Sequence, residues 1–569
     1  RRDGGMDGNL QFSTVQSNRI AGYTPSGRIG IRTGRWTLTA SGSGSFTPVA
    51  QSRFTETRGQ AGQPLPFAGR SDSKSRTNYG RGHFSAVFDP TPKHTAGFDI
   101  EYTERSTHMP TLSHTTLGQT QSDSRYRQHM GGNTLTATAN YIWKIDTLGS
   151  QFKLIADYTR YTSHGDNSYH TTTCTPGTLR DSLYESSTGS VYDILTADAG
   201  LTRKLSHGLT LRAGLRYTRN GMADDSRYAA QMQGTWQALP EYGYDQHYTE
   251  QIGAAYASLE YSAGRWELSA GLRGEYTSVA SQAFGRSYFG LFPNVSVSRA
   301  LNALRTWLLV AQWSRNIERP AFPALNPARI RISDYSWQSG NPSLRPTYIH
   351  RFSLTAVWKY RYTLTVGGNL HHDLIREIAH RDATDPDAVY IRPENHYTEN
   401  HWFVAASVPA KITRWWNLSV NAVGVMQRIR LNSTDSPATH YLMFADATCS
   451  FTLPAGFFAE AAYRAQSRLY SGNSEVGPRH TLSATVKKQL FGKRLTLFCT
   501  LSNITGCDWE FASLTDGMRR TIDARQAWSG RLWKAGAAWN FRAGKKFRAR
   551  TVESAAETQR KRLVKSTEQ

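Results

Sequence analysis

The sequence has no long hydrophobic run. Only 38% of the 569 residues are hydrophobic, and the mean hydropathy is −0.54. The purest apolar stretch, from Trp307 to Ala311, is far shorter than the roughly 18 residues that a membrane-spanning helix needs. These values exclude a helical membrane protein. Disorder is excluded as well, because aromatic residues reach 12% of the chain and disordered chains are poor in them.

Cysteine is also scarce, with four residues in the whole chain: Cys174, Cys449, Cys499 and Cys507. None of them belongs to a CxxC pair or to a Cys/His zinc pattern, so a disulfide scaffold and a zinc site are both excluded. The last two are close enough in the sequence to form a disulfide, but two free thiols are the simpler interpretation.

Catalytic and metal-binding motifs are missing. The sequence contains no HExxH, no GxSxG and no glycine-rich phosphate loop. His371 and His372 could suggest a metal or haem contact, yet adjacent residues of a strand point to opposite faces and cannot chelate together. Asp382, Asp385 and Asp387 lack the spacing of a known Ca²⁺ loop. We therefore predict a protein that is not an enzyme and that holds no cofactor and no metal.

Alternation of apolar and polar residues is the dominant pattern that the sequence does have. The stretch 209–217 carries apolar side chains at every odd position, with polar residues or glycine between them, and the stretch 266–276 repeats the scheme. Because a strand turns successive side chains to opposite faces, each such strand has one apolar face and one charged face.

The connections between these strands indicate how they are arranged. The pattern predicts about 22 strands, from 6–16 to 526–542, and every second link between them is only a few residues long. The long links all fall on the other side: 48–80, 107–132, 163–189, 221–247 and 316–346. Residues 1–542 are therefore predicted to form an all-β fold, a transmembrane antiparallel β-barrel with short periplasmic turns and long extracellular loops. A soluble sandwich or propeller is the alternative, and no blade-length repeat supports it.

Aromatic residues mark the two expected membrane boundaries. Tryptophan stands beside the short turns, as expected for a periplasmic girdle, at Trp36, Trp143, Trp266, Trp307, Trp358, Trp415 and Trp416. Tyrosine stands toward the opposite strand ends, at Tyr102, Tyr161, Tyr217 and Tyr276. The apolar faces between these levels, with Leu211, Ala213, Leu215 and Leu272, should contact lipid. The charged faces, with Arg212, Arg216, Arg273 and Glu275, should then point into the lumen.

Several motifs, in order along the chain, resemble the outer-membrane β-barrel family of TonB-dependent receptors. They are YASLEY at 256–261, AGLRGEY at 270–276, RNIERP at 315–320, LNP at 325–327, GNPSLRP at 340–346, KITRWWNL at 411–418, KKQLFGKRL at 487–495 and WNFRAGKK at 539–546. The resemblance implies a 22-stranded barrel around an N-terminal plug domain that TonB energises. The first predicted strand begins within the first dozen residues, so we expect this chain to be the barrel portion alone, with the plug and its contact to TonB absent.

The resemblance also suggests which residues have functional roles. It implies that lumen charges either hold the plug or line the substrate path, and plug packing is the favoured interpretation. These residues are Arg212, Arg216, Arg273 and Glu275. The loop 316–346, with Arg319, Trp337 and Asn341, is the expected substrate-contact surface. Its Asn-Pro and Gly-Asn-Pro turns could equally serve only to shape the loop. Without a plug, the lumen charges should be unpaired in a water-filled tube.

The last residues, 543–569, form a basic segment. They hold 8 Lys and Arg against 3 acidic residues, part of a net charge of +23 for the whole chain. The remaining positive charge is spread over strands and loops without a basic groove, so nucleic-acid binding is not expected. We predict a solvated C-terminal tail on the periplasmic side.

Together these observations predict an outer-membrane receptor or transporter of a Gram-negative bacterium, surrounded by outer-membrane lipid. The family implies import of a scarce nutrient, such as an iron chelate, haem, cobalamin, a peptide or a glycan, and the sequence does not choose among them. The alternative is a structural or assembly barrel that anchors a surface complex.

Overall fold

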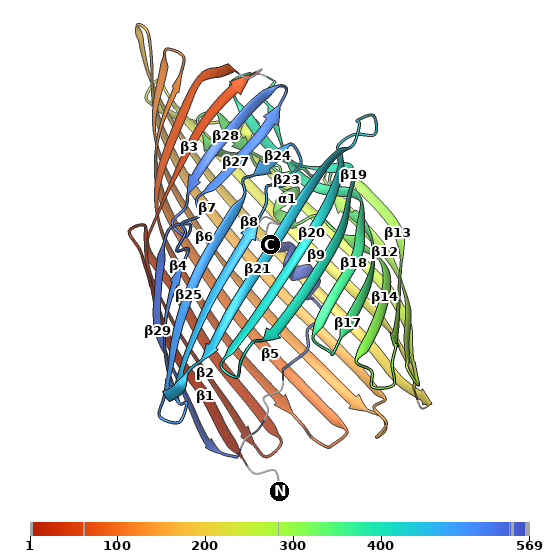
Figure 1. Cartoon of the computed structure of the whole chain (residues 1–569). Coiled ribbons are helices and arrows are strands. Elements are labelled where there is room, and N and C mark those ends of the chain that lie inside the picture. The colour runs from red at the N-terminus through yellow and green to blue at the C-terminus, as the bar shows by residue number, and fades with distance from the viewer. Residues whose placement is uncertain are drawn as a thin grey trace.

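The protein is one closed antiparallel β-barrel, seen in the computed structural model of Figure 1. Residues 4–60, 63–206, 208–282, 284–383, 385–545, 547 and 551–563 are described. They contain 29 strands, of which 22 form the ring. The first strand pairs with the last, from Gly5 opposite Gly544 to Gln16 opposite Trp533, and this pairing closes the barrel. The predicted fold class and the order of the predicted strands are confirmed.

The ring strands are β1 (Gly5–Gln16), β2 (Ile20–Thr33), β3 (Trp36–Gln60), β4 (Gln63–Phe88), β5 (His94–Leu117), β6 (Thr120–Lys144), β7 (Gln151–Thr175), β8 (Thr178–Ser206), β9 (Leu209–Met232), β11 (Tyr244–Ala263), β12 (Trp266–Ser281), β13 (Gly285–Ala300), β14 (Trp307–Glu318), β17 (Thr347–Trp358), β18 (Tyr362–Arg381), β19 (Val389–Lys411), β20 (Trp416–Arg430), β21 (Ala438–Thr452), β22 (Phe457–Gln466), β25 (Arg479–Leu490), β26 (Leu495–Ser502) and β29 (Leu532–Gly544).

Shorter elements lie in the connections and in the C-terminal tail: β10 (Thr235–Ala238), β15 (Ile330–Ser333), β16 (Ser336–Gln338), β23 (Leu469–Ser471), β24 (Ser474–Val476), β27 (Trp509–Thr515), β28 (Met518–Arg525), α1 (Phe322–Leu325), α2 (Glu557–Arg560), η1 (Pro240–Tyr242), η2 (Pro454–Gly456) and η3 (Lys561–Leu563). None of the helices in the described ranges is both long and apolar enough to cross a membrane.

Side chains of the ring strands alternate between lipid and lumen as the sequence predicts. Leu215 and Leu272 face outward and are 65% and 50% exposed, whereas Glu275 faces the lumen and is 6% exposed. Arg216 also points inward, where its Nε donates a hydrogen bond to Asp198 at 2.7 Å. The strand register is therefore the one that the alternation predicts.

The two aromatic levels are present, with one correction. Trp36, Trp143, Trp266, Trp307, Trp358 and Trp415 are exposed near the short turns, and Tyr102, Tyr217 and Tyr276 are exposed on the outer wall. Tyr161 was expected in the outer girdle and instead faces the lumen, where its ring stacks on that of Tyr192 with the ring centroids 5.4 Å apart. Tyr161 lies four residues after the buried Asp157 on β7, and residues an even number of positions apart in a strand point to the same face. The prediction therefore placed Tyr161 on the wrong face of the strand.

Most of the predicted outer loops are extensions of the strands. β5 and β6 run on to Leu117 and from Thr120, so the expected loop 107–132 is a tall hairpin around Gly118, whose positive φ of 60° suits glycine. The prediction failed because both faces of a strand are polar once it leaves the lipid, which removes the alternation while backbone pairing continues. Beyond Tyr217 on β9, for example, the outward positions include the exposed Arg219 and Asp225. The link 316–346 is the one among the five that folds as an irregular loop in the described chain.

Depth in the membrane should determine how well the outer wall of β12 tolerates charge. Leu272 lies midway between Trp266 and Tyr276, so Leu272→Arg should cost about 2–4 kcal/mol of folding free energy. Ser278→Arg, on the same face above Tyr276, should cost only about 0–1 kcal/mol. Urea titration of barrels refolded in lipid vesicles, read by heat-modifiable electrophoretic mobility, compares the two variants. Equal losses would contradict the assigned membrane level.

Candidate functional site in the lumen

The loop between β14 and β17 folds into the barrel instead of standing above it. Its helix α1 places Phe322 and Leu325, each 1% exposed, in a hydrophobic cluster together with Leu344. The rest of the cluster comes from the inner wall: Tyr192 and Ile194 of β8, Met222 of β9, Tyr248 of β11 and Val279 of β12. Burial of these apolar side chains holds one end of the loop against the wall.

The other end of the same loop crosses to different strands. Asp334, between β15 and β16, accepts hydrogen bonds from Ser124 at 2.7 Å and from Tyr126 at 2.6 Å, both on β6. Arg331 pairs with Asp334 at 2.8 Å. Ser336 accepts a hydrogen bond from Arg520 of β28 at 2.9 Å. The loop 319–346 is thus fastened to several sides of the barrel and obstructs the lumen, and we call it the inner loop.

A buried ion cluster lies where the inner loop begins. Arg319 Nη2 pairs with Glu275 Oε2 at 2.8 Å and donates to Thr277 at 2.9 Å, and its Nε lies 3.9 Å from Glu250. Arg273 approaches the other oxygen of Glu275 at 2.5 Å. Glu250 is 2% exposed and also accepts a hydrogen bond from Asn220 at 2.7 Å. These buried carboxylates are tolerable because each faces a cation.

The C-terminal tail supplies the other cation of this cluster. Arg562, 6% exposed, pairs with Glu250 and donates from Nε to the carbonyl oxygen of Pro320 at 3.0 Å. Its guanidinium also lies 4.3 Å from the ring centre of Phe322. The tail therefore contacts the wall and the inner loop at the same point.

The tail reaches this point through the lumen, and in Figure 1 its blue helical segment lies inside the barrel. Its contacts with the wall occur in sequence: Glu553 with Lys153 at 2.7 Å, the amide of Ala555 with Asp157 at 2.7 Å, and Gln559 with Asn220 at 3.2 Å. A pocket of about 320 Å³ remains between Glu553 and the wall. This differs from the solvated tail expected for 543–569, of which 546, 548–550 and 564–569 lie outside the described residues.

The lumen charges predicted from the sequence also differ from expectation, since they have partners within the chain. Arg212 pairs with Glu260 at 2.7 Å and Arg216 with Asp198 at 2.7 Å. Among the seven predicted residues, the structure brings Arg273, Glu275 and Arg319 together.

The sequence analysis missed two residues of the cluster, Glu250 and Arg562. The alternation along β11 could have shown that Glu250 points inward. The C-terminal tail has no such alternation, so nothing in the sequence indicated the position of Arg562.

The other two predicted loop residues hold the inner loop in shape. Asn341 donates from Nδ2 to the carbonyl oxygen of Pro393 at 3.0 Å, and its Oδ1 accepts from the amide of Ser343 at 3.0 Å. Trp337 lies half-buried on β16, with the guanidinium of Arg331 5.5 Å from its ring centre. Their role in contacting a substrate stays a prediction.

A second polar cluster surrounds Glu399 on β19. This carboxylate is fully buried and is bound by Arg376 at 2.9 Å, His401 at 2.8 Å and Gln427 at 2.8 Å. His371 points toward it and forms a 2.8 Å hydrogen bond between Nδ1 and the Glu399 carbonyl oxygen, whereas His372 points outward. The two adjacent histidines thus lie on opposite faces, as expected.

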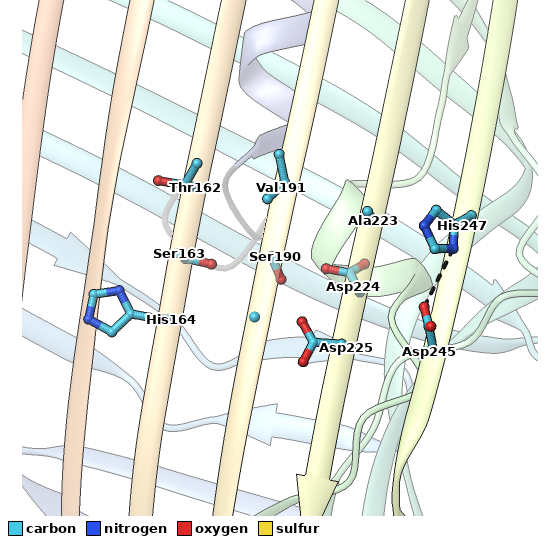
Figure 2. A pocket seen from close by; sticks show the side chains of 11 residues that line it. Thr162, Ser163, His164, Ser190, Val191, Ala223, Asp224, Asp225, Asp245 and His247 are labelled. Atoms are coloured by element: carbon cyan, nitrogen blue, oxygen red, sulfur yellow. Dashed lines mark ion pairs between the residues drawn. The ribbon is translucent and has the colours of Figure 1, made fainter.

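The described residues contain no group of three or more His, Cys, Asp or Glu side chains placed to hold a metal ion. The four cysteines are free, including Cys499 and Cys507. A pocket of about 470 Å³ opens on the outer wall, over Gly189 and between His164, Asp225, Asp245 and His247 (Figure 2). Its charged lining lies above the tyrosine level, outside the lumen.

Comparison with known proteins agrees with this architecture. The model of the outer membrane protein beta-barrel family matches residues 143–533. The chain belongs to that family. It is therefore an outer-membrane barrel, as the aromatic levels and the lipid-facing strands predict. No curated protein matches the sequence.

Solved structures share the fold of this outer-membrane barrel at low sequence identity. The ferric enterobactin receptor PfeA from Pseudomonas aeruginosa is 14% identical, with a TM-score of 0.59 over 94% of this chain and 80% of that one. The siderophore receptor PirA from Acinetobacter baumannii is 12% identical, with a TM-score of 0.58 over 94% and 80%. The copper transporter OprC is 12% identical, with a TM-score of 0.59 over 95% and 83%.

Removal of the central cation of the buried cluster should release the inner loop. Arg319→Ala leaves Glu275 and Glu250 short of a partner, and breaking such a buried pair costs about 3–5 kcal/mol. The control is Arg70→Ala on β4, because both side chains of the Arg70–Asp72 pair are exposed, at 53% and 40%, and exposed pairs contribute about 0–1 kcal/mol. Urea unfolding of the refolded barrel measures both, and similar losses would refute the central role of Arg319.

The tail should limit the flow of ions through the barrel. Arg562→Ala removes the contact with Glu250 and Phe322, so single-channel conductance in planar bilayers should rise toward that of a variant lacking 551–569. Lys561→Ala should leave conductance unchanged, because Lys561 is 61% exposed and pairs with Glu557, which belongs to the tail itself. Unchanged conductance in the Arg562→Ala and truncated proteins would show that the tail does not obstruct the pore.

Proposed function

We propose that this outer-membrane barrel is a receptor that captures a scarce nutrient at its extracellular end and imports it through the lumen. The observation that carries the proposal is the inner loop, which obstructs a wide lumen and is held by a small number of buried ion pairs. A permanently open channel has no need of such a fastening. Release of the Arg319 cluster would move the loop and open a path along the charged inner wall.

The comparisons support the same proposal at the level of fold. Two of the solved barrels are described as receptors for siderophores or ferric enterobactin, and a third as a copper transporter. On this basis we propose an iron chelate or another metal-containing nutrient as the first ligand to test, with haem, cobalamin, peptides and glycans after it.

Energy for import has to come from outside this barrel, because the outer membrane holds no nucleotide pool or ion gradient of its own. We propose TonB as the source, acting through a plug domain that approaches from the periplasmic rim, where β1 begins. The lumen-facing pairs Arg212–Glu260 and Arg216–Asp198 lie on the lower wall, where they would exchange partners with a plug.

A structural role is the second candidate, and the tall hairpins of β3 to β9 favour it. These strands continue well past the tyrosine level with polar residues on both faces. Such a rim could anchor a surface-exposed partner. In that case the barrel would copurify with an outer-surface protein and import no ligand.

Uptake by whole cells tests the import proposal. Cells that express the intact gene should accumulate one of the labelled ligands, and accumulation should stop in a strain lacking TonB or after collapse of the proton gradient. Trp337→Ala should weaken uptake at low ligand concentration more than at saturation, because Trp337 faces the proposed path. Trp236→Ala, an exposed tryptophan on β10, is the control. Accumulation that ignores TonB and the proton gradient would point to passive diffusion instead.

A further inference from the structure

Four oxygen atoms are buried without hydrogen-bond partners on the inner wall, just above the hydrophobic cluster. They are Oδ2 of Asp224, Oγ of Ser226, Oη of Tyr244 and Oε1 of Gln246. The exposed fractions of Asp224, Ser226 and Gln246 are 1%, 3% and 7%. Buried polar atoms are nearly always hydrogen-bonded, so four orphaned oxygens at one place indicate a ligand.

The strand register brings these four side chains together. Asp224 of β9 lies directly opposite Gln246 of β11, and Ser226 lies directly opposite Tyr244 in the neighbouring row. All four point inward, and side chains of such directly opposed pairs have Cβ atoms about 4.5–5.5 Å apart. The four side chains therefore lie next to one another on two adjacent strands.

The inner loop covers this patch. The next row below contains Met222 and Tyr248, which pack against Phe322 and Leu325 of α1. Ala328, three residues after the end of α1, is 6% exposed. The side chain of Asn326 interacts with both Asp224 and Tyr244. Water is thus excluded by the same segment that obstructs the lumen.

The Asp224 carboxylate has no cationic partner among the ion pairs of the described chain. Its Oδ1 accepts a hydrogen bond from Tyr192 of β8 at 3.1 Å, and the side chains of Ser190 and Asn326 lie close to the carboxylate. No donor in hydrogen-bonding geometry reaches its Oδ2. The titratable groups that face it are Tyr192 and Tyr244, with Asp225 next to it on the opposite face of β9 (Figure 2). None of these groups brings a positive charge.

Burial raises the pKa of Asp224 from 3.8 to about 6. This part of β9 lies above the lipid, since the outward residues that flank it, Arg219 and Asp225, are charged and exposed. At neutral pH the carboxyl group is therefore mostly ionised, in a place where an unpaired charge is costly.

We propose that Asp224, Ser226, Tyr244 and Gln246 form a binding site for one hard cation, which fastens the inner loop to the barrel wall. A carboxylate, two hydroxyls and an amide carbonyl form an all-oxygen donor set, which suits alkali and alkaline-earth cations and not soft transition metals. A single carboxylate neutralises a single positive charge. The site therefore fits Na⁺ better than Ca²⁺, which is usually held by several carboxylates.

Hydrogen exchange of the inner loop tests the proposal without reference to transport, so it can fail while the import proposal stands. The full chain, refolded in detergent, is compared in NaCl and in N-methylglucamine chloride at equal ionic strength. Exchange of the amides of 322–344 should slow by the factor 1 + [Na⁺]/Kd, about tenfold when Na⁺ is ten times its Kd.

Asp224→Asn keeps the shape of the side chain and removes its charge, so the effect of Na⁺ on exchange should disappear. Asp225→Asn is the matched control: it changes the same charge on the adjacent residue of β9, which points outward, and it should retain the full effect. A response to Na⁺ that is equal in both variants would overturn the site, as would the absence of any response in the parent chain. A parallel titration with CaCl₂ decides the charge of the ion, and a response to Ca²⁺ alone would overturn the assignment of Na⁺.

The pH dependence gives a second readout. Because its pKa is raised in the folded barrel, Asp224 contributes stability below its ordinary pKa of 3.8, and that contribution is lost as the pH rises through about 6. In N-methylglucamine chloride the thermal midpoint should fall over this window. Na⁺ should flatten the fall, because the cation replaces the proton, and an identical fall in both salts would contradict cation binding.

Discussion

Satisfaction of backbone hydrogen bonds in lipid is the constraint on which this structure depends. The membrane offers no water to an unpaired amide or carbonyl group, so a sheet can cross it only when it closes on itself. Here closure occurs through β1 and β29, which pair along their whole facing lengths. With the ring closed, lipid and lumen become two separate environments, and the alternation of every strand follows from the need to place apolar side chains in one and polar side chains in the other.

Where the inner loop and the tail displace water from the lumen, an unpaired charged side chain is costly because it loses its hydration. The structure meets this condition by pairing: Arg319 with Glu275, Arg562 with Glu250, and Arg376 with Glu399. Buried pairs of this type contribute little net stability, because desolvation offsets most of the attraction, but they fix geometry and are costly to break singly. The inner loop and the tail therefore have defined positions without a large hydrophobic core beneath them.

The sequence predicts those features that depend on local alternation. The ring strands, their order and the inward direction of Arg216 and Glu275 follow from the side-chain period alone. Features that depend on partners distant in the chain do not follow. Tyr161 was placed on the wrong face because aromatic residues occur on both faces of the wall, and the hairpin at 107–132 was missed because polar residues on both faces resemble a loop. The path of the tail could not be predicted, since the contact between Arg562 and Glu250 joins residues 312 positions apart.

The direction of the tail has a mechanical consequence. Its root lies at the periplasmic rim beside the end of β29, and its contacts climb the wall in chain order, from Lys153 through Asp157 and Asn220 to Glu250. A force that pulls the tail from its periplasmic end loads these contacts one after another. The peak force is therefore set by the strongest single contact and not by the sum of all of them. The last contact to be loaded is that of Arg562, which binds both Glu250 of the wall and the carbonyl oxygen of Pro320 in the inner loop. Tension applied in the periplasm would thus reach the extracellular side only after the whole tail had been peeled away.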